Sequence, residues 1–109
     1  MGESEKATEN YLRVKVQRAS GMCFKFVSPG MRGVPDRICL FPGGILIFVE
    51  VKSEGEPLEP HQTRMHLYMK RRGALVYTVD TKAGVDKLVN FYSEVENVLK
   101  PNSSIARNP

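Results

Sequence analysis

The fold is decided by residues 36–52, which read DRICLFPGGILIFVEVK. Arg37–Phe41 and Ile45–Val51 are rich in apolar and β-branched residues, and Pro42-Gly43-Gly44 between them is typical of a turn. The stretch therefore predicts an antiparallel β-hairpin with a short loop. Both faces of this hairpin would be apolar, so we expect it to lie at the centre of a sheet that is covered on both sides.

The register of the hairpin brings its charged ends together. If the turn is centred on Gly43, antiparallel pairing sets Asp36 opposite Glu50. Directly opposed residues have Cβ atoms roughly 5 Å apart. Side chains alternate between the two faces of a strand, so Asp36, Glu50 and Lys52 share one face. The sequence therefore predicts two carboxylates and one ammonium group at neighbouring strand ends.

The opposed carboxylates of Asp36 and Glu50 predict a metal site. Like charges at this distance repel, and burying them without compensation would cost several kcal/mol per ion. A divalent cation resolves this conflict. Carboxylate oxygens suit Mg²⁺ or Mn²⁺, and Mg²⁺ commonly takes one or two carboxylates together with waters and phosphate oxygens. The alternative is a set of ordinary surface residues at strand ends, as most single matches to so short a pattern are.

The remaining segments predict helices and strands around the hairpin. They are a helix over residues 3–19 that ends at Gly21 as a left-handed stop, a strand over 22–27, a loop over 28–33, a helix over 60–72, a strand over 74–79, and a last helix capped by Asp80 or Thr81. The helix between the third and fourth strands is long enough to join parallel neighbours. We therefore expect an α/β fold with a mixed central sheet flanked by helices.

Composition indicates one small globular domain. The chain has 109 residues, 41% of them hydrophobic, and we expect a single domain over residues 1–100 and a disordered tail over 101–109. The net charge of +4 suits a polyanionic partner but does not require one. Cys23 and Cys39 lack the spacing of a zinc site, and we interpret both as buried thiols. No membrane span or signal segment is recognisable, so we expect an intracellular, cytoplasmic protein.

The second predicted helix carries a polar residue on its apolar stripe. That stripe comprises Leu58, Gln62, Met65 and Met69. The amide of Gln62 should therefore point toward the sheet, although a first-turn residue that satisfies free backbone groups is an equal interpretation. His61 and His66 fall away from the stripe, and we expect each to be solvated or to face DNA.

Three motifs together resemble one nuclease superfamily. They are Gly33-Val34-Pro35-Asp36-Arg37, Glu50-Val51-Lys52 and the segment from Leu58 to Gln62. In combination they resemble the PD-(D/E)XK nucleases and, among these, the virus-type replication-repair nuclease (VRR-NUC) domain of small stand-alone phage and bacterial proteins. The resemblance spans roughly residues 5–88 and implies a restriction-endonuclease-like α-β-β-β-α-β core, which agrees with the order of the predicted segments.

The resemblance also implies a role for each residue of the motifs. Asp36, Glu50 and the Val51 carbonyl would bind Mg²⁺, for which Mn²⁺ could substitute. Lys52 would position or help deprotonate the attacking water. Gln62 would support Lys52 or the metal ligands.

A first-helix acid is a further part of the resemblance. Related Holliday junction resolvases carry this acid in an E-x-x-L context, which Glu9-Asn10-Tyr11-Leu12 matches, and Glu5 competes for the same role.

Basic and polar residues could hold the DNA backbone near the site. These are Lys25, Ser28, Arg32, Arg37 and Arg64, together with the basic run over residues 70–72, which could equally be a solvated helix end.

We therefore expect a metal-dependent DNA endonuclease. No base-reading element is recognisable in the sequence, so selection by DNA shape is favoured over selection by base sequence. The resemblance implies a homodimer that resolves Holliday junctions. The alternatives are a flap- or duplex-directed nuclease of repair or restriction type, and a DNA-binding module without catalysis.

Overall fold

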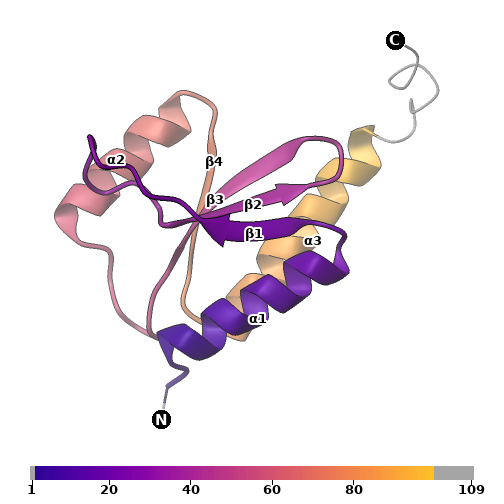
Figure 1. Cartoon of the computed structure of the whole chain (residues 1–109), viewed down its shortest axis with the longest axis horizontal. Coiled ribbons are helices and arrows are strands. Elements are labelled where there is room, and N and C mark those ends of the chain that lie inside the picture. The colour runs from indigo at the N-terminus through magenta and orange to yellow at the C-terminus, as the bar shows by residue number, and fades with distance from the viewer. Residues whose placement is uncertain (1, 100–109) are drawn as a thin grey trace.

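The computed structural model describes residues 2–99, which form a four-stranded sheet flanked by helices (Figure 1). The elements are α1 (Glu5–Arg18), β1 (Met22–Lys25), β2 (Arg37–Phe41), β3 (Ile45–Val51), α2 (Pro60–Arg71), β4 (Leu75–Val79) and α3 (Lys82–Leu99). The strands lie in the order β1-β2-β3-β4, and only the β3-β4 pair is parallel. The predicted α/β fold with a mixed sheet is confirmed, whereas the predicted tail over 101–109 lies outside the described residues.

The central hairpin has the predicted register. Arg37 pairs with Val49, and the same register continued by one residue sets Asp36 opposite Glu50. The turn between the strands relies on glycine, because Gly43 has a φ of 88° and side chains rarely adopt this left-handed conformation. The local chemistry of the turn therefore determines which residues meet at the far end of the strands.

The main core lies between the sheet and helices α1 and α3. Buried side chains of both helices meet the inward residues of β2 and β3; they include Leu12, Val16, Cys39, Phe41, Ile47, Val49, Val85, Leu88 and Tyr92. Cys39 is fully buried as expected, whereas Cys23 on the edge strand β1 is only half-buried. No helix within residues 2–99 is long and apolar enough to span a membrane.

The end of α1 differs from the prediction in one respect. The left-handed residue is Ser20, with a φ of 64°, and not Gly21. Gly21 is required for a different reason, because a Cβ atom there would lie 2.9 Å from the carbonyl oxygen of Leu40. The glycine therefore allows the chain to pass close to β2 as it enters β1.

The second face of the sheet is only partly covered, so the expectation that the hairpin is covered on both sides is confirmed only in part: Ile38 is buried on this face, whereas Leu46 is exposed. Helix α2 packs on this face, mainly against β4. Met22, Phe24 and Leu46 on the other strands remain 63%, 42% and 38% exposed. A helix is about 10 Å wide and strands lie about 4.8 Å apart, so a single helix covers roughly two of the four strands.

Candidate active site

The candidate site lies where β2, β3 and α2 meet. Asp36 immediately precedes β2, Glu50 is the second-last residue of β3, and Lys52 directly follows that strand. The charges of Asp36 and Lys52 both act on Glu50, as expected for side chains on one face. Gln62 reaches the same face from α2. The structure therefore brings together the four side chains that the three motifs predict.

The amide of Gln62 points toward the sheet and also satisfies a free backbone group at the start of α2, which are the two roles that its sequence position suggests. Its Nε2 atom donates a hydrogen bond to Oε2 of Glu50 at 3.2 Å. Its Oε1 atom accepts a hydrogen bond at 2.9 Å from the backbone N–H of Glu59, the residue that caps α2. Because the amide is held at both ends, Gln62 restricts the orientation of the Glu50 carboxylate.

Burial and the neighbouring carboxylate of Asp36 destabilise the anionic form of Glu50. Burial is the main cause that raises the pKa of Glu50 to about 7, repulsion from Asp36 adds to it, and attraction to Lys52 opposes it. Burial likewise raises the pKa of Asp36, although the positive charge of Arg37 counteracts the effect. The Oδ1 atom of Asp36 is buried and accepts no hydrogen bond from any of the residues 2–99. A buried acceptor beside a second carboxylate is a suitable environment for a cation.

These donors fit a hard divalent cation. Within residues 2–99, no three His, Cys, Asp or Glu side chains gather as a metal-binding group. The candidate side-chain ligands at the site would be the carboxylates of Asp36 and Glu50, and Val51 lies directly between Glu50 and Lys52 in the chain. Mg²⁺ and Mn²⁺ accept such a small set of oxygen ligands, because water and phosphate oxygens complete their coordination.

Lys52 is almost completely buried beside the carboxylates. Its side chain is 9% exposed, and Nζ lies 3.8 Å from Oε2 of Glu56. The other oxygen of Glu56 accepts a hydrogen bond from the backbone N–H of Ser53 at 3.1 Å. Glu56 thus supports the ammonium group from the loop after β3. This role of Glu56 was not predicted from the sequence, although a carboxylate four residues after a lysine is a signal that could have indicated it.

The first-helix acid at the site is Glu9, while Glu5 is exposed at the start of α1. Oε1 of Glu9 forms an ion pair with a guanidinium nitrogen of Arg37 at 2.7 Å. The negative charge of Glu9 also contributes to the raised pKa of Asp36. Arg37, only 6% exposed, therefore compensates acidic charge inside the protein and does not present its guanidinium group to solvent.

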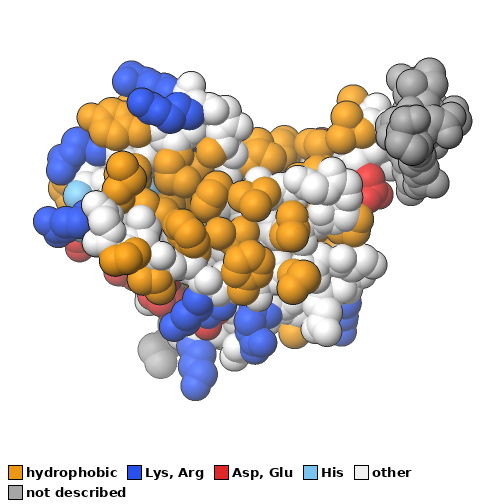
Figure 2. Space-filling view, turned by 45° about the horizontal axis from the view of Figure 1, so that its top comes forward, with side chains coloured by type: hydrophobic (Ala, Val, Ile, Leu, Met, Phe, Trp, Pro, Cys, Tyr) orange, Lys and Arg blue, Asp and Glu red, His pale blue; other side chains and the backbone are white. Residues whose placement is uncertain are grey.

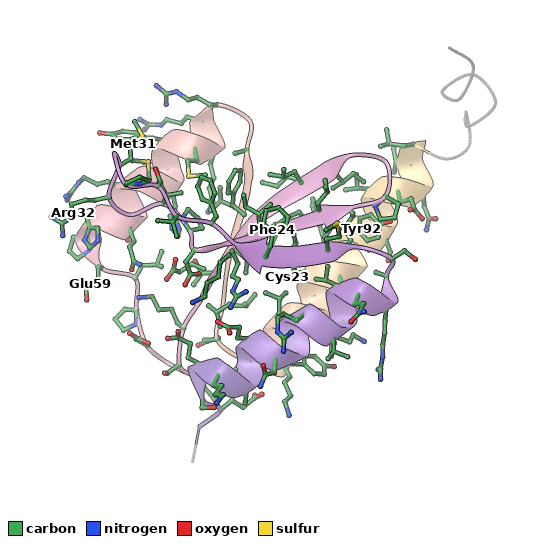
Figure 3. The ribbon with its side chains drawn as sticks, viewed as in Figure 1. Cys23, Phe24, Met31, Arg32, Glu59 and Tyr92 are labelled. Carbon is green, nitrogen blue, oxygen red and sulfur yellow. The ribbon has the colours of Figure 1, made fainter. Side chains whose placement is uncertain are left out.

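The other predicted phosphate-binding residues lie at or near the surface. Lys25 is exposed at the end of β1, Ser28 is half-buried in the following loop, and Arg64 is exposed on α2. Figure 3 shows Arg32 on that loop, at the outer side of α2. The positive charge of Lys25 lowers the pKa of Asp36, and Lys25 pairs with Arg37 in the register of β1 and β2.

His66 is a buried part of this region, so the expectation of a solvated or DNA-facing side chain is wrong. It is 3% exposed, and its imidazole interacts with the backbone carbonyl of Gly33. Gly33 has a φ of 87°, and a Cβ atom there would lie 2.5 Å from the carbonyl oxygen of His61. The loop before Asp36 is therefore packed directly on α2. His66 follows Gln62 by one helical turn, and this spacing is the sequence signal that could have placed it on the same side of α2.

The fold and the site together define a class of protein. A mixed α/β sheet with two opposed carboxylates and a lysine at its strand ends, and with a supporting glutamine from a helix, is the arrangement of the PD-(D/E)XK nucleases.

Comparisons with known proteins identify the family. No family model matches the chain. It is 42% identical over 78 residues to "Putative nuclease p44" of Acyrthosiphon pisum secondary endosymbiont phage 1, and the match covers 72% of this chain and 84% of the relative. A solved structure described as "VRR_NUC domain" has a TM-score of 0.76 and 33% identity, and covers 83% of this chain and 98% of that one. The chain belongs to the VRR-NUC nuclease family.

Proposed function

We propose that this nuclease is a Mg²⁺-dependent endonuclease that cuts branched DNA, and that it resolves Holliday junctions as a homodimer. The observation that supports metal dependence most strongly is the opposed pair of Asp36 and Glu50. One carboxylate has a buried oxygen that accepts no hydrogen bond within residues 2–99, and the pKa of the other is raised to about 7. Such a pair costs stability when it is ionised without a cation.

The chain's own residues position the reactants. Asp36 and Glu50 would hold Mg²⁺, or Mn²⁺ in its place, with the Val51 carbonyl as a backbone ligand. When bound, the metal would acidify water and withdraw negative charge from the phosphate. The buried ammonium group of Lys52 would orient the attacking water and stabilise the negative charge of the transition state. Gln62 would keep Glu50 in the orientation that binds the metal.

Exposed basic residues support a DNA substrate. Lys25, Arg32 and Arg64 would contact phosphates, and the chain carries a net charge of +4. Phosphate contacts carry no base information, so we propose selection by the shape of the DNA. The similar phage protein supports an activity in the cytoplasm of a bacterial or phage-infected cell.

A homodimer follows from the symmetry of the substrate. A four-way junction is resolved by paired incisions, which need two active sites in a fixed relation. Residues 2–99 contain one set of Asp36, Glu50 and Lys52. Two copies related by a twofold axis would supply the second set.

The proposal is tested by incubation of the purified protein with end-labelled four-way junctions, flaps and linear duplexes in MgCl₂. We expect paired, symmetric cuts in the junction. Asp36→Ala and Lys52→Ala should each lose cleavage while retaining junction binding, and Glu5→Gln, at an exposed acid of α1, should cut like the wild type. Wild-type incision by Asp36→Ala or Lys52→Ala would refute the mechanism.

The same substrates separate the alternatives. Preferential cutting of flaps or linear duplexes would replace the resolvase by a repair or restriction nuclease with the same chemistry. A DNA-binding module predicts no Mg²⁺ binding heat that depends on Asp36 and Glu50, so calorimetry of wild type and Asp36→Ala distinguishes it directly.

A further inference from the structure

The two cysteines of the chain lie opposite each other on neighbouring strands. Cys23 on β1 is the direct partner of Cys39 on β2 in the antiparallel register. Cys39 is fully buried, whereas Cys23 is half-buried on the edge strand of the sheet. Solvent therefore reaches one thiol of the pair, and the second thiol lies directly beside it in the core.

The hydrogen-bond pattern of the two strands makes the cysteines the closer kind of pair. The backbone N–H of Phe26 donates to the carbonyl of Asp36 at 2.8 Å, which marks these two residues as a hydrogen-bonded pair. Such pairs alternate with non-hydrogen-bonded ones, so Cys23 and Cys39, three pairs further along, form a non-hydrogen-bonded pair. The Cα atoms of such a pair are about 4.5 Å apart. A disulfide spans about 4.4–6.8 Å between Cα atoms, so the backbone already has the separation that an S–S bond needs.

The surroundings of the two thiols give them different reactivities. Interaction with the side chain of Cys39 is the main cause that lowers the pKa of Cys23, and the positive charges of Arg37 and Arg13 act in the same direction, while burial opposes them. The pKa of Cys39 is raised by Cys23 and by burial. Because the thiolate is the nucleophile, the half-buried Cys23 is the thiol that reacts first.

We propose that Cys23 and Cys39 are a thiol-oxidation site, which a small disulfide oxidant converts into a reversible intramolecular disulfide that leaves the carboxylate site unchanged. The thiolate of Cys23 attacks one sulfur of the oxidant, whose S–S bond breaks and releases a first thiolate. Sγ of Cys39 then attacks Sγ of Cys23 in the mixed disulfide, and a second thiolate leaves. Each released thiolate takes up one of the two cysteine protons. The protein loses two electrons, and the oxidant is reduced to two thiols.

The disulfide would lie on the face of the sheet away from the carboxylates. Cys23 packs against the main core, and Figure 3 shows it on the side of β1 that faces α1. Side chains alternate along a strand, so Asp36 lies on the opposite face of the sheet from Cys39. Figure 2 shows hydrophobic side chains gathered across the middle of its view, on that opposite face. The bond therefore changes neither the apolar surface nor the position of Asp36.

The bond would enclose residues 24–38, which include Gly33 and Asp36. A disulfide acts mainly by restricting the unfolded chain, and a loop of this length should lower the equilibrium constant for unfolding by roughly 100-fold. The expected consequence of oxidation is a nuclease that is more resistant to unfolding and equally active.

The test incubates the folded, full-length chain with oxidised glutathione and follows free thiols and intact mass. The wild type should lose both thiols and the mass of two hydrogen atoms, without a covalent link to a second chain, and dithiothreitol should restore both thiols. Cys39→Ala should instead accumulate glutathione on Cys23, because the second step is blocked. Cys23→Ser is the matched control and should keep its single buried thiol.

The rate and the effects of oxidation complete the test. The wild type should oxidise roughly tenfold or more faster when folded than in urea, because the fold holds the two sulfurs together. Urea unfolding should show the stabilisation in the wild type and none in oxidant-treated Cys23→Ser. Oxidised and reduced protein should cleave DNA at equal rates.

Several results would overturn the proposal, and none of them depends on which DNA the nuclease cuts. They are two thiols that persist in the folded wild type, a disulfide that joins two chains, a mixed disulfide that Cys39 does not resolve, and oxidation that requires urea. Loss of cleavage on oxidation would also overturn it, because the bond would then disturb the carboxylate site.

Discussion

Glu50→Gln should stabilise the metal-free protein at alkaline pH although it abolishes the proposed metal site. The substitution keeps the shape of the side chain and an oxygen that can accept the hydrogen bond from Gln62. It removes the negative charge and replaces the other oxygen by an NH₂ group. Glu50 is 7% exposed, so its ionised form lacks the solvation that an exposed carboxylate would have.

The expected magnitude follows from the pKa of Glu50. Burial, with repulsion from Asp36, raises this pKa from its ordinary value of 4.5 to about 7. One pKa unit corresponds to about 1.36 kcal/mol, so ionising Glu50 should cost the folded metal-free protein about 3 kcal/mol. The folded state binds the proton more tightly than the unfolded state. The contribution of Glu50 to stability is therefore complete below pH 4.5 and is lost as the pH rises through about 7.

The measurement is urea unfolding in EDTA at pH 4, 6 and 8, followed by circular dichroism at one protein concentration. At pH 8 the free energy of unfolding of Glu50→Gln should exceed that of the wild type by about 2–3 kcal/mol. At pH 4 the two should agree. Added MgCl₂ should stabilise the wild type at pH 8 and leave the variant unchanged. A variant that is equal to or less stable than the wild type at pH 8 without metal would refute the electrostatic reasoning.

Two further substitutions probe the helix that supports the site. Gln62→Ala should weaken Mg²⁺ binding measured by calorimetry by about 10–100-fold, because it removes the hydrogen bond to Glu50; unchanged affinity would contradict the supporting role. Gly33→Ala should lower the free energy of unfolding by about 2–4 kcal/mol, since its Cβ atom would lie 2.5 Å from a backbone oxygen of α2 at a φ of 87°. Gly30→Ala is the control, because no atom of residues 2–99 would lie within 4 Å of its Cβ; equal stability of both variants would contradict the close packing.

The predictable part of the site depends on local geometry. The turn at Gly43 and the alternation of side chains along a strand are enough to place Asp36 opposite Glu50, and the structure confirms this register. Gln62 was also predictable, because helical spacing set its amide among apolar residues that face the sheet. Its second hydrogen bond, to the backbone of Glu59, shows that both interpretations of its position were correct.

The unpredicted part depends on segments that meet only in the folded chain. The pairing of Arg37 with Glu9 requires α1 to lie across the beginning of β2, and no spacing within either segment reveals it. The apolar stripe of α2 predicts that His66 faces solvent, whereas its imidazole in fact interacts with the backbone of the loop at Gly33. Polar residues buried against backbone groups leave no hydrophobic pattern in the sequence.

The sequence by itself determined the order of the elements, the hairpin register and the three motifs, because each depends on the residues of one or two adjacent segments. Only the tertiary structure decided which acid of α1 reaches Arg37 and how much of the sheet remains open. An apolar strand has the same composition whether a helix, a second copy or solvent covers it. The exposure of Met22, Phe24 and Leu46 therefore depends on the number and position of the helices that pack on the sheet.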